Sequence, residues 1–163
     1  KCVDDQTQYQ KVASKLISAD SLLYIGRGLD YALSMEGSLK LKEISYIHSE
    51  SYAAGELKHG TISLIEDGMP VIAVATQHDL YEKTMSNIKE VNTSGATVVM
   101  VCSEDMKFDG NDVDYPVMLP LARDLLMPLV AVVPLQLIAY YTAALKNFDV
   151  DHPRNLAKSV TVE

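Results

Sequence analysis

Three charged side chains occur at helical spacing in the segment 31–45: Glu36, Lys40 and Glu43. At about 100° per residue they gather on one arc of a helix, with apolar residues on both sides. We predict ion pairs between Lys40 and both carboxylates, because charges on a partly buried face are costly unless they are paired. The arc suits acid–base chemistry in a cleft, and a purely structural ion-pair network is the alternative.

The other arcs of this helix separate apolar from polar side chains. One apolar stripe holds Leu33, Gly37, Leu41 and Ile44, and a second holds Met35 and Leu39. A polar arc holds Ser34, Ser38, Lys42 and Ser45, and we predict that this arc faces solvent. Since that arc already supplies a solvated face, the charged arc is predicted to line a cleft rather than to face open water.

A histidine follows in the next segment, 50–60, where Gly55 and Gly60 bracket a short predicted helical turn. The pKa of a histidine lies near neutrality, so His59 is a candidate for proton transfer if it faces the cleft. A surface or capping role is the more common one for an isolated histidine. The other histidines (His48, His78 and His152) and the two cysteines (Cys2 and Cys102) have no metal-ligand spacing, so no metal site is predicted.

Strands alternate with helices along the chain, which predicts an α/β fold with a parallel sheet covered on both faces. The predicted strands are 21–25, 69–75, 96–102 and, at an edge, 113–119, and the predicted helices are 5–18, 30–46, 78–92 and 121–147. Ligands of such sheets bind beyond the carboxyl ends of the strands, which draws attention to the turn at Gly26–Gly28. A Gly-x-Gly without a third glycine is only a weak dinucleotide signal.

The bulk properties exclude several classes of protein. The 163 residues fit one domain, and the formal net charge of −8 with no basic run argues against a nucleic-acid surface. Residues 125–145 carry no charge and are long enough to span a bilayer, but Pro128, Pro134 and Gln136 favour a buried helix that is kinked or restarted at Pro134. The absence of a signal peptide and the two isolated thiols favour the cytoplasm and no membrane.

Three segments, 35–48, 53–60 and 149–163, resemble the second sugar isomerase (SIS) domain of the glucosamine-6-phosphate synthase family, and Pro134–Tyr140 also fits that pattern. The resemblance covers essentially the whole chain. It implies an SIS-type three-layer sandwich in which helices flank a five-stranded parallel sheet. It divides the chain into a domain, 1–148, and a C-terminal catalytic tail, 149–163. Only four strands are predicted above, so one is expected to have been missed.

The resemblance also implies an activity and assigns site residues. The family converts fructose 6-phosphate and glutamine-derived ammonia to glucosamine 6-phosphate, without a cofactor. Glu43 would move the proton between C1 and C2 with Lys40 beside it, and His59 would open the sugar ring from across a homodimer interface. Lys158 would form a Schiff base with the C2 carbonyl. The implied partners are the sugar phosphates and the glutaminase and first SIS domains of the same chain, the latter holding the phosphate.

Two alternatives stay open on the sequence. One is another SIS enzyme, such as a deglycase, deaminase or isomerase, against which the ending Arg154–Glu163 argues. The other is a non-catalytic sugar-phosphate-binding or dimerisation module. If Lys158 and Glu43 act on adjacent carbons of one sugar, their side-chain ends are expected within roughly 8 Å of each other. We expect the tail to reach that position by folding over the carboxyl edge of the sheet.

Overall fold

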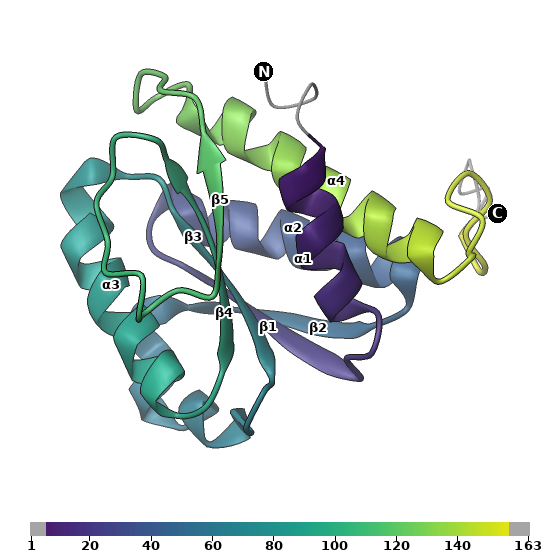
Figure 1. The fold of residues 1–163 in the computed structure, drawn as a ribbon, viewed down its shortest axis with the longest axis horizontal. Helices are drawn as coiled ribbons and strands as arrows, with labels where there is room; N and C mark the ends of the chain where they lie inside the picture. Colours follow the sequence, from purple (N-terminus) through teal and green to yellow (C-terminus); the bar gives the residue numbers. More distant parts are fainter. Residues whose placement is uncertain (1–5, 157–163) are drawn as a thin grey trace, which may run out of the picture.

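The computed structural model describes residues 6–156 and places a parallel sheet between two layers of helices (Figure 1). The strands are β1 (Ser21–Gly26), β2 (His48–Ala53), β3 (Pro70–Ala75), β4 (Thr97–Ser103) and β5 (Tyr115–Leu119). The α-helices are α1 (Thr7–Leu16), α2 (Leu29–Ser45), α3 (His78–Thr93) and α4 (Met127–Leu145). Two 3-10 helices, η1 (Ala54–His59) and η2 (Thr61–Leu64), follow β2. The strand order β2-β1-β3-β4-β5 confirms the predicted five-stranded three-layer fold.

Alternate residues of the strands build two separate cores. Tyr24, Ile72 and Val101 pack against α1, α2 and α4 on one face, whereas Ile25 and Met100 pack against α3 and η1 on the other. All six residues of β3 are buried, as expected for a central strand of a parallel sheet covered on both sides. The continuous apolar runs of the predicted strands therefore reflect burial on two faces.

The strand that the sequence analysis missed is β2, an edge strand that pairs with β1 from Ser21↔His48 to Gly26↔Ala53. Its sequence, His-Ser-Glu-Ser-Tyr-Ala, lacks the apolar run that marks the other strands. An edge strand needs no such run, because only part of its surface is covered. The predicted helical turn after it is confirmed, as η1.

The polar arc of α2 does not face solvent, so that prediction was wrong. Ser34, Ser38 and Ser45 are buried, and of the predicted arc only Lys42 is exposed. The small side chains let α2 approach β2 closely: the hydroxyl of Ser49 in β2 lies 3.0 Å from that of Ser38 and donates to the Ser38 carbonyl at 2.8 Å. The hydroxyls of Ser34 and Ser45 donate to carbonyls one turn earlier in the helix, so their burial leaves no polar group unpaired.

The second apolar stripe of α2 is left uncovered instead. Met35 is 46% exposed and Leu39 is 42% exposed, whereas Leu33 and Leu41 of the first stripe are buried as predicted. Sequence periodicity identified both stripes but could not say which of them meets this chain's own core.

The apolar segment near the C-terminus forms α4, which begins at Met127 rather than near residue 121 and continues through Pro134 to Leu145. By length and composition this helix could cross a membrane, which is weak evidence because core helices pass the same test. Its Leu135 and Ile138 are fully buried in the core, as the prediction of a buried helix requires. The opposite side exposes Leu129 and Tyr140.

The tail does not follow the predicted route. In a parallel sheet the helix after each strand runs back to the amino ends of the strands, so α2 and α4 both end there. The described part of the tail leaves α4 at that end (Figure 1), and the Phe148 ring packs at a tilt against Tyr46 just beyond α2, with ring centroids 4.9 Å apart. The expectation that the tail lies over the carboxyl edge is therefore wrong for residues 149–156.

Candidate functional site

The charged arc of α2 forms the two predicted ion pairs. The Lys40 amine donates to the Glu43 carboxylate at 2.7 Å and lies 3.9 Å from a Glu36 oxygen. The side chains of Glu36, Lys40 and Glu43 are 39%, 34% and 25% exposed, so they line a surface without being sealed from water. The hydrogen bond that Lys40 donates to Glu43, followed by the charges of both carboxylates, raises the pKa of Lys40 above its ordinary value. Lys40 therefore stays a cation and acts as a donor.

A hollow of about 430 Å³ adjoins Glu43 at the amino end of the sheet. It is lined by Lys42, Glu43, Tyr46, Ile47 and His48 from the end of α2 onward and by Arg154, Asn155 and Leu156 from the tail. The tail thus forms one wall of the cavity that contains the candidate general acid–base. Two segments more than a hundred residues apart in the sequence meet there.

Tyr46 holds the described tail against α2 through three contacts. The Arg154 guanidinium lies 4.0 Å from the Tyr46 ring centroid, and the Arg154 backbone N–H donates to the Tyr46 hydroxyl at 3.0 Å. Phe148 supplies the third contact. Tyr46 caps α2 in the left-handed region, with φ 60°, which costs on the order of 1–2 kcal/mol for a residue other than glycine. That conformation turns the tyrosine out of the helix and under the tail.

Lys158 lies outside the described residues, so its predicted distance to Glu43 stays a prediction. Cys2 also lies outside them. Cys102 is a buried free thiol of β4, and burial raises its pKa to about 12, which makes it a poor nucleophile.

His59 does not meet Glu43 within this chain. It ends η1, whose Leu57 belongs to the core on the α3 face, whereas Glu43 lies in α2 on the opposite face of the sheet. The His59 ring is 73% exposed, and its Nδ1 lies 2.7 Å from a Glu56 carboxylate oxygen. An imidazole presented to solvent in this way can reach a site only on another chain or another domain.

At the carboxyl edge, the N-terminus of α2 is already occupied by side chains of the β3–α3 turn. The Gln77 carboxamide, oriented to satisfy its neighbours, accepts from the backbone N–H groups of Leu29 and Asp30 at 2.9 and 3.0 Å. The buried Asp30 carboxylate accepts in turn from Thr76 N, Thr76 Oγ1 and Gln77 N, at 2.7, 2.6 and 3.3 Å. The donors that a phosphate would use are thus taken.

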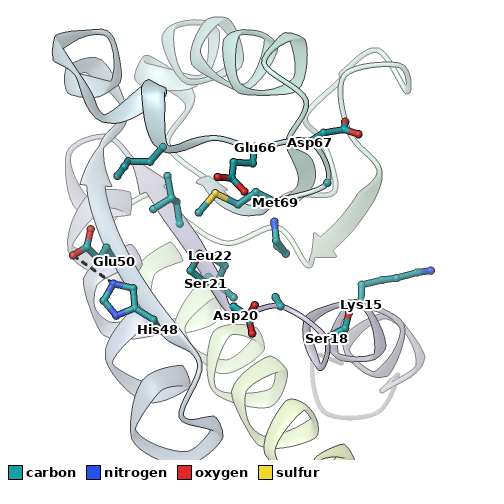
Figure 2. Close-up of a pocket in the computed structure, with 15 residues that line it drawn as sticks. Lys15, Ser18, Asp20, Ser21, Leu22, His48, Glu50, Glu66, Asp67 and Met69 are labelled. Carbon is teal, nitrogen blue, oxygen red and sulfur yellow. Dashed lines mark ion pairs between the residues drawn. The ribbon is translucent and has the colours of Figure 1, made fainter.

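A larger hollow, of about 540 Å³, lies beside the first at the amino ends of β1, β2 and β3 (Figure 2). Figure 2 shows His48 and Glu50 paired on one wall and Glu66, Asp67 and Met69 on another. Of the predicted catalytic residues that the structure describes, Lys40, Glu43 and His59, none lines it. Of the two hollows, the smaller one contains a predicted catalytic residue, Glu43, together with the described part of the tail.

One interaction at the carboxyl edge was missed by sequence reasoning. The His78 ring lies 2.9 Å from an Asp105 oxygen and 3.0 Å from an Asp124 oxygen, and the Asp105 hydrogen bond above all raises the His78 pKa. Its partners are 27 and 46 residues away, so no local spacing could reveal it. Within residues 6–156 no cluster of three or more histidine, cysteine or acidic side chains is arranged to bind a metal ion.

Comparisons with known proteins agree with this architecture. A model of the SIS domain family matches residues 15–146, which contain the whole sheet and the charged arc of α2. The fold and the site therefore define an SIS domain.

Sequence relatives show which family of SIS-domain proteins the chain belongs to. The chain is 53% identical to the glutamine–fructose-6-phosphate aminotransferase (isomerizing) of Clostridium tetani over all 163 residues, which make up 27% of that protein. It is 50% identical to a protein of the same name from Sphingobium yanoikuyae, over 94% of this chain and 99% of that one. The chain therefore belongs to the glutamine–fructose-6-phosphate aminotransferase (isomerizing) family, which confirms the resemblance predicted from its motifs.

Solved structures place the chain in the same way. It superposes on the C-terminal domain of glucosamine-fructose-6-phosphate aminotransferase from Francisella tularensis with a TM-score of 0.84 and 36% identity, covering 93% of this chain and 43% of that one. A glucosamine-6-phosphate deaminase from Thermotoga maritima follows with a TM-score of 0.68 and 25% identity, covering 98% and 48%. The chain thus spans less than half of these structures and about a quarter of the Clostridium tetani protein.

Proposed function

We propose that this chain supplies the acid–base half of a sugar-phosphate isomerase site that makes glucosamine 6-phosphate from fructose 6-phosphate and ammonia released from glutamine. The observation that carries the proposal is the Lys40–Glu43 pair at a hollow walled by the tail. Glu43 transfers the proton between C1 and C2 of the open-chain sugar. Lys40, held as a cation, orients the Glu43 carboxylate through its 2.7 Å hydrogen bond and donates to substrate oxygens. Lys158 forms the Schiff base at C2.

The ring-opening step is assigned to His59 of a second copy of the chain. This assignment is supported by the position of His59 on the face of the sheet opposite to Glu43 and by its exposed ring. A homodimer in which η1 of one subunit reaches α2 of the other would complete the site. Because Cys102 is a free thiol, we assign the activity to the cytoplasm.

The phosphate is assigned to a preceding SIS domain of the same polypeptide, together with a glutaminase domain that supplies ammonia. Gln77 fills the helix end where this chain would otherwise hold a phosphate. We propose that the preceding SIS domain packs against two exposed apolar surfaces of this chain. They lie at Met35 and Leu39 of α2 and at Leu129 and Tyr140 of α4. The greater length of the relatives leaves room for it.

This division of the site predicts weak binding by the chain alone. Calorimetry of the 163-residue chain with fructose 6-phosphate should give a dissociation constant of about 1 mM or weaker, which corresponds to roughly −4 kcal/mol. The reason is that most of the affinity for a sugar phosphate is expected from the phosphate contacts, which the proposal assigns to another domain. A low-micromolar constant would contradict the assignment of the phosphate to another domain.

The Schiff base provides a direct test of the proposed function. Borohydride added to the full-length protein during turnover should reduce the imine and attach the sugar irreversibly to Lys158. Mass spectrometry of the tryptic peptides should locate the adduct, and Lys158→Ala should abolish both the adduct and synthesis. An adduct on another lysine, or none in an active enzyme, would overturn the role of Lys158. A non-catalytic sugar-binding module, the main alternative, would yield no adduct.

A further inference from the structure

The contact between Tyr46 and Arg154 fixes the described tail beside Glu43. Tyr46 follows Glu43 by three positions and is the left-handed C-cap residue of α2. Its ring contacts the Arg154 guanidinium, and its hydroxyl accepts from the Arg154 backbone N–H. No other described residue both lines the Glu43 hollow and holds the tail through its ring and its hydroxyl. Tyr46 adopts the left-handed region at the C-cap of α2, with φ 60°.

We propose that Tyr46 is a positioning residue for the reaction: it docks the tail through Arg154 and so sets the approach of the tail lysine to the substrate. The inference rests on the proposed function, because it concerns Lys158. Lys158 follows Arg154 by four positions. Four extended residues span at most about 14 Å, so a chain anchored at Arg154 has a short reach from the end of α2.

The contact has two separable parts. The ring lies under the guanidinium and packs against Phe148 at an interplanar angle of 57°, and the hydroxyl accepts from the Arg154 backbone N–H. Tyr46→Phe removes only the hydroxyl and Tyr46→Leu removes both parts. Arg154→Lys keeps the charge but loses the planar group that stacks on an aromatic ring, so it should behave more like Arg154→Ala than like the wild type.

The test measures synthesis by the full-length protein carrying each variant. Tyr46→Leu and Arg154→Ala should each lower kcat by about 10- to 100-fold, since a misplacement near 1 Å can cost about that much, while KM for fructose 6-phosphate changes by less than about threefold. Tyr46→Phe should retain most of kcat. The double variant should be no worse than either single one, because both remove the same contact. Tyr115→Leu is the matched control: it removes a tyrosine–cation contact with Lys11 at β5, and kcat should stay unchanged.

A second readout follows the tail itself. Trypsin cleaves after Arg154, and docking on Tyr46 should protect that bond, so Tyr46→Leu should accelerate cleavage there by tenfold or more. Cleavage after Arg123, in the exposed segment before α4, should keep its rate and serves as the internal standard. Two results would overturn the inference and indicate a general structural role for Tyr46. In the first, Tyr46→Leu loses activity without faster cleavage after Arg154. In the second, Tyr46→Phe lowers kcat as much as Tyr46→Leu does.

The two levels of the proposal fail in different ways. If Lys158→Ala and Glu43→Gln abolish synthesis while Tyr46→Leu is fully active, the docking inference is wrong and the proposed function stands. If Lys158→Ala retains activity, the proposed function fails first and the docking inference falls with it. Faster cleavage together with an unchanged kcat would also contradict the inference, because the tail would then work without its anchor.

Discussion

Glu43→Gln in the full-length protein should reduce the formation of glucosamine 6-phosphate by about 10²–10⁴-fold, the usual loss for one general acid–base. Glutamine hydrolysis should persist, because the proposal assigns it to a different domain. Glutamine keeps the size of the side chain but cannot accept a proton or balance the charge of Lys40, which donates to Glu43 at 2.7 Å. Parallel assays of glutamate release and of amino-sugar formation check the result.

Glu36→Gln supplies the matched control on the same helix. Glu36 also faces Lys40, but at 3.9 Å and with a more exposed side chain, so its removal deletes a similar charge without deleting the close pair. We expect a loss of threefold or less. Equal losses for the two variants would mean that the net charge of the arc matters rather than a proton transfer at Glu43, and an unchanged rate for Glu43→Gln would remove that residue from the mechanism.

Asp30→Ala should strongly destabilise the fold, although it lies far from the proposed chemistry. Asp30 is 2% exposed and accepts three hydrogen bonds from Thr76 and Gln77. Truncation leaves those donors buried without an acceptor, and we expect a loss of about 2–4 kcal/mol in the free energy of unfolding. Urea denaturation of the 163-residue chain measures it. A loss below about 1 kcal/mol would show that water replaces the carboxylate.

Asp30→Asn tests the charge separately from the shape. Burial raises the pKa of Asp30 above its ordinary value of 3.8, even though its hydrogen bonds oppose the shift. The folded state then binds the proton more tightly than the unfolded state, so this group's contribution is full below about pH 3.8 and declines as the pH rises through the folded pKa. The stability of the wild type relative to Asp30→Asn should therefore fall as the pH rises from about 3.5 to 7. A relative stability that rises with pH would contradict the raised pKa.

The sequence predicted those parts of the fold that depend on apolar runs and local spacing. The three buried strands, the edge strand β5, the three longer helices after them and both ion pairs of Lys40 follow from periodicity and from i, i+3 and i, i+4 geometry. The edge strand β2 escaped because its residues are polar, and the serine arc was misplaced because a helical wheel cannot show that Ser38 and Ser49 share a tight contact.

The site was predictable only in part, for a similar reason. Glu43 and Lys40 can be recognised from the spacing of charges on their helix. The contact of Tyr46, by contrast, is with Arg154, 108 residues away. The contact of Gln77 is with the N-terminus of α2, nearly fifty positions earlier in the chain. Such contacts exist only after the chain has folded. The local pattern made His59 only a conditional candidate, and Lys158 was named by the family resemblance alone.

The buried serines of α2 also determine how rigidly the helix that carries Glu43 is held. Ser38 and Ser49 lock the helix to β2 at two hydrogen-bonding contacts, so α2 cannot slide or rotate without leaving buried hydroxyls unpaired. Glu43 therefore lies on a rigid scaffold, and under the proposed function its carboxylate would need little reorganisation as charge develops on the sugar. Tyr46, one residue beyond α2, holds the described part of the tail to the same scaffold, so this wall of the Glu43 hollow should also need little rearrangement when a substrate binds.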